Sequence, residues 1–146
     1  GGSMARVAFT VTERWPIDSQ RVWDALVDWA GHAEWVPATT VRIESGDGGH
    51  GTVFIARTGL GPLAFDDTMQ VVQFDPTART ASVRKLGPLL TGTAGFTVVP
   101  EGSASRLEWF EDVEVPRLPN IATPLARGVA RLSFRLALGR LRRTLT

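Results

Sequence analysis

The sequence predicts an α+β domain in which a seven-stranded antiparallel sheet wraps around one long C-terminal helix, with two short helices after the first strand. Three observations predict this class. A strand-like segment precedes two short helical segments, six further strand-like segments follow in series between turn residues, and the C-terminal segment is apolar at helical spacing. The 146 residues are expected to form a single domain over residues 4–146, and residues 1–3 are interpreted as a remnant of an expression vector.

The first strand and the two short helices are predicted in the N-terminal quarter of the chain. Apolar residues alternate with small or polar ones over residues 7–11, as in a strand with one apolar face. Pro16 ends this strand, because proline cannot continue a ladder. Residues 18–19 offer capping side chains for a helix whose apolar stripe lies within residues 22–29, and a second short helix is expected at residues 32–36.

Six strands are then predicted, each separated from the next by a turn rich in glycine or proline. They are expected at residues 40–44, 51–58, 64–74, 79–86, 93–99 and 106–115. Short connections of this kind give an antiparallel meander. The segment GDGGHG at residues 46–51 is interpreted as a hairpin turn, because it lacks the Lys-Ser/Thr ending of a phosphate-binding loop and leads into a strand.

The C-terminal helix, predicted to start after Pro119 and Pro124, carries two apolar stripes on roughly opposite sides. One stripe contains Leu125, Val129, Leu132 and Leu136, and the other contains Phe134, Leu138, Leu141 and Leu145. A helix that is apolar on two sides is buried on both or meets a second partner. Since one helix rarely fills a strongly bent sheet, we expect a cavity between them.

Charge is distributed unevenly, although the net charge is only +1. Residues 117–146 contain seven arginines and no acid, whereas the preceding residues contain nine basic and fifteen acidic side chains. We favour the interpretation that the positive segment docks electrostatically on its own domain. The alternative is a surface for anionic lipid or nucleic acid. No nucleic-acid-binding motif is present, so we expect no nucleic acid partner.

The segment VWDALVDWAGHAEWVPATTVRI at residues 22–43 resembles the START/Bet v 1-like (SRPBCC) superfamily, and within it the bacterial polyketide cyclase/dehydrase and lipid transport family. GLGPLAFDDTMQVVQFDP at residues 59–76 and SRLEW at residues 105–109 support the resemblance, which covers about residues 7–145. It implies a helix-grip fold enclosing an apolar pocket for lipids, sterols or polyketides. It does not imply catalysis, because many members only bind ligands.

Alternation along the strands predicts the residues that face the cavity. Among residues 64–74, the phase of Phe65, Asp67 and Met69 is placed inward, because threonine and glutamine suit the solvent face. The inward face of residues 51–58 is undecided, since both phases are apolar. The predicted ligand contacts are Trp35, Val36, Phe65, Asp67, Met69, Val83, Lys85, Phe96, Val98, Trp109 and Leu132.

The tryptophans of the 22–37 segment are assigned different positions. Trp29 follows the buried stripe and is expected in the core, whereas Trp23 lies off it and is expected to be half exposed. Trp35, with Val36, is interpreted as a gate beside the cavity mouth. The alternative is that Trp35 only anchors its helix to the sheet.

Asp67, Lys85 and Glu111 are the polar residues predicted to face inward. Asp67 and Lys85 are expected to pair, either as an anchor for a polar group of the ligand or exposed to water at the end of the sheet. His32 is expected to be exposed or to cap a helix, and His50 to be exposed. Without cysteine, and with two distant histidines, no metal site or cofactor is expected.

Three functions are compatible with these patterns. The leading one is non-catalytic binding of a small hydrophobic, lipid- or polyketide-like ligand by a carrier or sensor. The second is a polyketide cyclase, aromatase or dehydratase, which requires a perturbed acid or base deep in the pocket. The absence of tyrosine argues against this enzyme.

The third function is a membrane- or partner-binding protein that uses the arginine-rich helix. We expect a monomer or homodimer. No apolar run is long enough to span a bilayer and no signal peptide precedes Arg6, so a cytoplasmic protein is expected.

Overall fold

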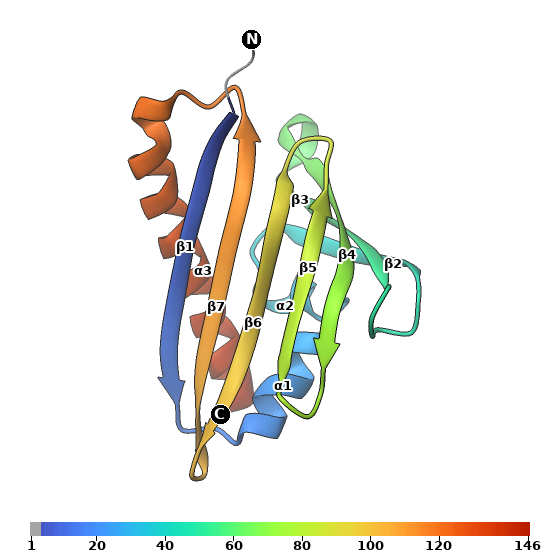
Figure 1. The fold of residues 1–146 in the computed structure, drawn as a ribbon, viewed down its shortest axis with the longest axis vertical. Coiled ribbons are helices and arrows are strands. Elements are labelled where there is room, and N and C mark those ends of the chain that lie inside the picture. The colour runs from blue at the N-terminus through green and yellow to red at the C-terminus, as the bar shows by residue number, and fades with distance from the viewer. Residues whose placement is uncertain (1–3) are drawn as a thin grey trace.

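The computed structural model describes residues 4–146, and the interpretation of residues 1–3 lies outside this range. A seven-stranded antiparallel sheet curves around one long helix, as predicted (Figure 1). The strands are β1 (Met4–Trp15), β2 (Thr39–Ser45), β3 (Val53–Thr58), β4 (Phe65–Asp75), β5 (Thr80–Leu86), β6 (Thr91–Glu101) and β7 (Ala104–Pro116). The helices are α1 (Ser19–Val27), α2 (His32–Trp35) and α3 (Thr123–Leu145), with 3-10 turns η1 (Gly61–Leu63) and η2 (Asn120–Ala122).

The strand order is β1-β7-β6-β5-β4-β3-β2, so each strand from β2 to β7 lies beside its neighbour in sequence and β1 joins at the far edge. β1 pairs with β7 along its whole length, from Met4 opposite Pro116 to Trp15 opposite Ser105. At Gly92 in β6, a Cβ atom would collide with the carbonyl oxygen of Asp112 in β7. Glycine therefore allows the close approach of these two strands.

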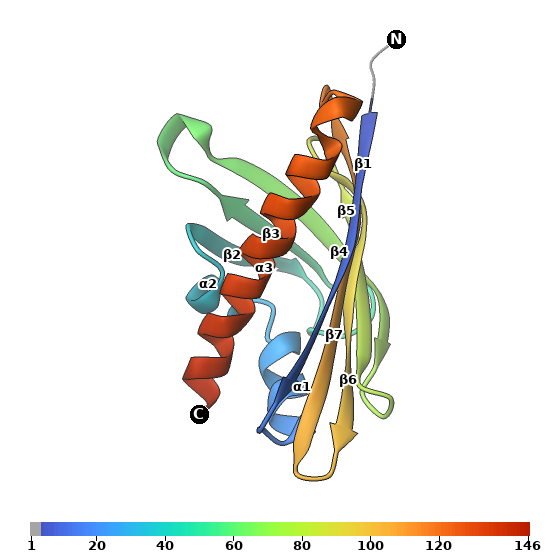
Figure 2. The same cartoon turned by 90° about the vertical axis from the view of Figure 1, so that its left-hand side faces the viewer.

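α3 lies across the concave side of the sheet, and α1 and α2 lie on the same side, where α2 contacts α3 (Figure 2). Its inward face is the stripe that begins at Phe134 and includes Leu138 and Leu141, which are buried. The other predicted stripe faces solvent, and Leu132 in it is 58% exposed. Of the two alternatives for this helix, burial on both sides is therefore wrong, and contact of the exposed stripe with a second partner stays a prediction.

α1 begins where the sequence predicts, because the side chain of Asp18 accepts a hydrogen bond from the amide of Gln20 at 3.1 Å. Trp23 is buried, which corrects the expected half exposure. Its ring packs against those of Phe74 and Phe96, with centroid distances of 5.5 and 5.8 Å. The sheet curves under α1 enough to cover a side chain that lies off the main apolar stripe.

The predicted hairpin turn at residues 46–51 joins β2 to β3 and also holds a core tryptophan. The indole Nε1 of Trp29 donates a hydrogen bond of 2.7 Å to the carbonyl oxygen of Gly48. Trp29 is buried, as predicted, and stacks on Phe54 of β3. The glycine-rich segment therefore acts as a structural turn that satisfies a buried donor.

The arginine-rich segment does not dock electrostatically on the body of the domain, contrary to the favoured interpretation. Within residues 4–146, no arginine from residue 117 onward forms an ion pair with a carboxylate. α3 is held to the sheet by apolar packing instead. No helix in the part of the chain that the structure describes is long and apolar enough to cross a membrane.

Candidate ligand-binding cavity

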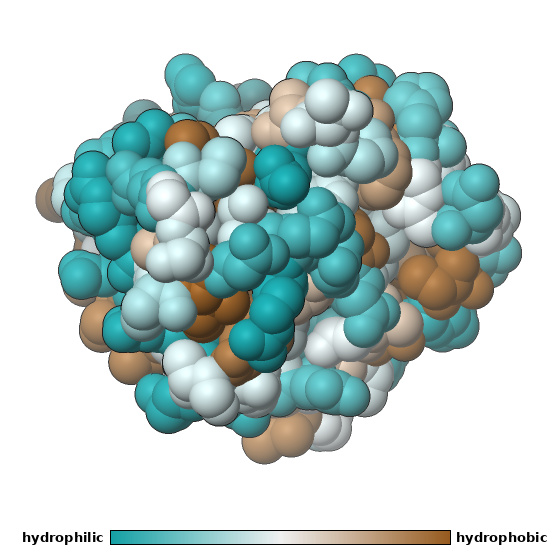
Figure 3. Space-filling model, turned by 90° about the horizontal axis from the view of Figure 1, so that it is seen from below, coloured by the Kyte–Doolittle hydropathy of each residue, from teal (hydrophilic) through white to brown (hydrophobic). Residues whose placement is uncertain are grey.

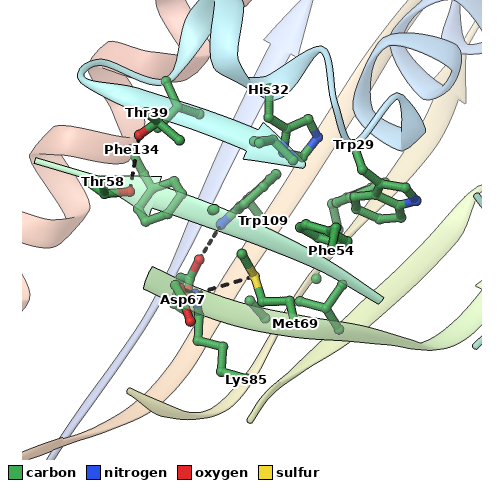
Figure 4. Close-up of a pocket in the computed structure, with 18 of the residues that line it drawn as sticks. Trp29, His32, Thr39, Phe54, Thr58, Asp67, Met69, Lys85, Trp109 and Phe134 are labelled. Atoms are coloured by element: carbon green, nitrogen blue, oxygen red, sulfur yellow. Dashed lines mark hydrogen bonds and ion pairs between the residues drawn. The ribbon is translucent and has the colours of Figure 1, made fainter. Parts of the chain in front are cut away.

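A partly open cavity of about 130 Å³ lies between the concave face of the sheet, α2 and α3. Its lining comes from β2 to β7 on one side and from Trp29, α2 and Phe134 of α3 on the other (Figure 4). Apolar and aromatic side chains dominate this lining. The cavity expected between the bent sheet and the helix is therefore present, although it is small.

Eight of the predicted ligand contacts line the cavity. They are Trp35, Val36, Asp67, Met69, Val83, Lys85, Phe96 and Trp109. The strand residues among them alternate with outward-facing neighbours, as predicted, because one face of the sheet is buried. That these residues contact a ligand stays a prediction.

Three predicted contacts lie elsewhere. Phe65 is the first residue of β4 and lies beyond the cavity, half-buried. Val98 is buried in the core farther along β6, past Phe96. Leu132 faces solvent, because Phe134 takes the inward position on α3.

The remaining lining residues were not predicted as ligand contacts. They are Trp29, His32, Thr39, Val41, Phe54, Ala56, Thr58, Ser82, Ala94, Gly95, Glu111 and Phe134. Phe134 belongs to the other predicted stripe of α3, and the sequence periodicity marks both stripes without showing which one meets the sheet. For Phe54 and Ala56 the sequence carried no signal of direction, because both faces of β3 are apolar.

Aromatic rings form the wall between α2 and the sheet. Trp35 meets Trp109 edge-on at a centroid distance of 6.2 Å, and Trp109 stacks on Phe96 at 5.5 Å. Offset and edge-on contacts of this kind are favourable and hold the rings rigidly. Trp35 is buried in this arrangement. Its function as a gate stays a prediction that requires α2 to move.

A buried polar cluster, formed by Asp67, Lys85 and Glu111, lies in the wall of the cavity. Lys85 Nζ donates to Asp67 Oδ2 at 2.6 Å, and the indole Nε1 of Trp109 donates to Glu111 Oε1 at 3.2 Å. The alternative that this pair is exposed at the end of the sheet is therefore wrong. Asp67 Oδ1 is buried without a hydrogen-bond partner among the described residues.

Each member of the polar cluster faces a small residue on one neighbouring strand, whereas on the other side Lys85 faces Met69 and Glu111 faces Phe9. Asp67 pairs with Ala56, Lys85 with Gly92, and Glu111 with Ala94. Side chains directly opposite each other on adjacent strands normally fill the space between them. Here the small partners leave that space open, which explains why the cavity lies beside the polar cluster.

The charges of the cluster depend on one another. Burial opposes the charge on Lys85, but the carboxylates of Glu111 and Asp67 outweigh it and raise the pKa of Lys85 above 10.5. Burial also raises the pKa of Glu111 above 4.5, against the opposing effects of Lys85 and the Trp109 indole. The cluster therefore combines a stable ammonium–carboxylate pair with a carboxyl group that holds its proton to higher pH.

His32 caps the C-terminal end of α1, which was one of its two predicted positions. Its Nε2 donates a 2.6 Å hydrogen bond to the carbonyl oxygen of Leu26, and its ring packs between Trp29 and Trp35. Burial lowers the pKa of His32 below 6.5. The neutral ring at the cavity wall leaves Nδ1 as an acceptor. His50 is exposed, as predicted.

No cluster of three or more histidine, aspartate or glutamate side chains able to hold a metal ion occurs within residues 4–146. The one dense group of charged side chains at the cavity includes a lysine, whose ammonium repels cations. Its side chains form hydrogen bonds with one another and with Trp109.

Solved structures with the same fold include proteins of different activities. The aromatase/cyclase Zhui from Streptomyces sp. R1128 has a TM-score of 0.76 and 19% identity, over 98% of this chain and 94% of that one. Major latex-like protein 151 from Panax ginseng has a TM-score of 0.74 and 10% identity, over 96% and 97%. Truncated norcoclaurine synthase from Thalictrum flavum has a TM-score of 0.70 and 18% identity, over 95% and 94%.

These likenesses establish the helix-grip fold of Bet v 1-like proteins. A comparison with curated protein sequences gave no match. The sequence does match, over residues 6–146, the family described as "Polyketide cyclase / dehydrase and lipid transport". The curved sheet, the long helix and the match over nearly the whole chain lead to one conclusion: this protein belongs to the polyketide cyclase/dehydrase and lipid transport family.

Proposed function

We propose that the protein binds a small hydrophobic, lipid- or polyketide-like ligand in the cavity and acts as a carrier or sensor without catalysis. The observation that carries the proposal is an aromatic-lined cavity whose wall includes Asp67, a carboxylate with one buried oxygen, Oδ1, that has no hydrogen-bond partner among the described residues. Apolar walls with a few fixed polar groups are characteristic of small-molecule sites. The family assignment agrees with this function.

The size of the cavity limits the part of the ligand that it holds. A volume of about 130 Å³ is close to that of engineered cavities that bind benzene. A second, more open groove of about 560 Å³ adjoins it, and the two share Val36 and Thr39. We therefore expect a ring-sized end of the ligand in the cavity and the remainder in this groove.

The polar cluster sets the orientation of the bound ligand. Asp67 Oδ1 needs a hydrogen-bond donor, because a buried acceptor without a partner costs roughly 1–3 kcal/mol. A hydroxyl group on the end of the ligand that enters the cavity supplies this donor. Burial of its apolar surface, worth roughly 25 cal/mol per Å², supplies the affinity.

Calorimetric titration with 2-naphthol, an aromatic alcohol of suitable size and polarity, tests the proposal. We expect saturable binding by the wild-type protein and none by Ala94→Phe, which fills the space opposite Glu111. Ala78→Phe, at an exposed turn, is the matched control and retains binding. Equal binding by wild type and Ala94→Phe would exclude the cavity as the site. Native mass spectrometry of protein from its own host then identifies the natural ligand.

A second candidate function, a cyclase, aromatase or dehydratase, is favoured by Glu111. This carboxyl group lies deep in the cavity with a raised pKa, which suits a general acid–base at neutral pH. As a carboxylate it would take an α-proton from the substrate, and as an acid it would return the proton to the oxygen of the attacked carbonyl. Zhui, a structural neighbour, is an aromatase/cyclase.

The two candidates differ in what Glu111→Gln does. If the protein is an enzyme, this variant binds a poly-β-ketone substrate analogue but forms no cyclised product, and Glu108→Gln on the outer face of β7 remains active. If wild-type protein binds the analogue without converting it, the carrier function stands. Product formation is followed by mass spectrometry.

A further inference from the structure

The outward face of α3 carries an uncovered apolar stripe. We call Leu125, Val129, Leu132 and Leu136 the outer stripe; they are 57–72% exposed. Ile121 in η2, just before the helix, is 91% exposed. An exposed row of large apolar side chains along one helix face is unusual for a soluble surface and marks an interaction site.

Arginines flank the outer stripe. At 100° per residue, Arg131, Arg135 and Arg142 lie about 100° around the helix from the stripe, and Arg140 lies on its other side. All four are exposed, and none forms an ion pair with another described residue. An apolar row beside unpaired arginines is the pattern of a helix that lies in the interface of an anionic bilayer.

A second apolar projection lies on the same side of the sheet as α3. Leu60 and Leu63, in the connection between β3 and β4, are 77% and 85% exposed. In Figure 2 this connection extends on the side of the sheet that α3 covers. Leu60 and Arg140 both border the groove that adjoins the cavity. Figure 3 shows the opposite end of the molecule, where hydrophilic residues predominate and hydrophobic residues form separate patches.

From these observations we infer that the outer stripe and its arginines dock the protein on an anionic lipid surface. The inner stripe of α3 stays packed on the sheet, so docking needs no unfolding. A second copy of the chain fits this face less well, because a symmetric contact would bring two segments of seven arginines and no acid together. The inference concerns the outside of the molecule and does not depend on what the cavity binds.

Vesicle flotation tests the docking surface. We expect the wild-type protein to float with vesicles made of equal parts phosphatidylcholine and phosphatidylglycerol, and not with phosphatidylcholine alone. Each arginine near an anionic surface is worth roughly fivefold in partition. The variant Arg131→Gln/Arg135→Gln/Arg142→Gln should therefore bind ~100-fold more weakly. The matched control Arg14→Gln/Arg21→Gln/Arg42→Gln makes the same charge change away from α3 and should bind like wild type.

The apolar contribution needs its own variant. Leu125→Gln/Leu132→Gln/Leu136→Gln should also lose flotation, whereas Ile43→Gln/Phe110→Gln, at exposed positions elsewhere, should retain it. The inference is overturned if the wild-type protein does not float with the anionic vesicles. It is also overturned if the control variants lose as much flotation as the test variants, or if the leucine variant floats as well as the wild-type protein. A wild-type dimer that the leucine variant converts to monomers, measured by analytical ultracentrifugation without vesicle binding, assigns the face to a second copy instead. Naphthol binding, measured separately, reports on the cavity alone.

Discussion

At the residue scale, three charged side chains determine the chemistry of the cavity. Lys85 is held by Asp67 at 2.6 Å and lies close enough to Glu111 for their charges to interact. Removing one partner of such a buried pair is costly, because the other charge stays in an apolar environment. The sequence alone identified all three as inward-facing polar residues.

Lys85→Met should lower the free energy of unfolding by about 3–5 kcal/mol. The substitution leaves the buried carboxylate of Asp67 without its cation. Urea unfolding measures the change, and Arg84→Met is the control, since the neighbouring side chain is exposed on the other face of β5. An equal effect of the two substitutions would contradict the ion pair as a structural element.

The stability of the protein should fall as the pH drops below about 6.5, in part because of His32. Burial lowers its pKa in the folded state, so the unfolded chain binds a proton at a higher pH than the folded chain does. The neutral His32 ring makes its full contribution to the free energy of unfolding above about pH 6.5. This contribution is lost as the pH falls towards the pKa of His32 in the folded state. His32→Gln should flatten this part of the profile, and His50→Gln should leave it unchanged, as measured by thermal unfolding across pH.

At the scale of elements, one-sided burial explains why the inward faces of the strands were predictable. In β4, β5, β6 and β7, apolar and polar residues alternate, so the sequence marks the covered face. β3 lacks this contrast, and its direction follows only from its pairing with β4. On α3 both stripes are apolar, and the wrong one was assigned to the cavity.

Shortening one leucine in each stripe of α3 shows which stripe contributes to the stability of the fold. Leu138→Ala should destabilise the protein by roughly 2–5 kcal/mol, because the side chain is fully buried. Leu132→Ala, on the outer stripe, should change stability by less than about 0.5 kcal/mol. Urea unfolding of both variants gives the comparison. A large loss in Leu132→Ala would show that the outer stripe is covered in solution.

At the scale of the whole molecule, the cavity forms only because the sheet, α2 and α3 meet around it. Its residues come from Trp29 to Phe134 in the sequence. A ligand bound there contacts the folded state alone and therefore stabilises the whole domain. Ligand binding in the cavity can therefore be measured as an increase in the stability of the whole domain.

2-Naphthol at a concentration of 100 times its Kd should stabilise the folded protein by about 2.7 kcal/mol. For a domain of this size, the midpoint of thermal unfolding should rise by roughly 5–10 °C. Differential scanning calorimetry measures the shift, and Ala94→Phe should show none. A similar shift in that variant would place the binding site outside the cavity.

From the sequence one can predict the element order, the fold class, the family and the inward position of Asp67, Lys85 and Glu111. These features follow from local periodicity, turn residues and the contrast between apolar and polar faces. The tertiary structure decided which stripe of α3 meets the sheet, which face of β3 turns inward, and how much space remains between them. These three features depend on pairing between segments that are distant in the sequence, so no single segment reveals them. The small residues Ala56, Gly92 and Ala94, each opposite a charged residue on one side, are an example.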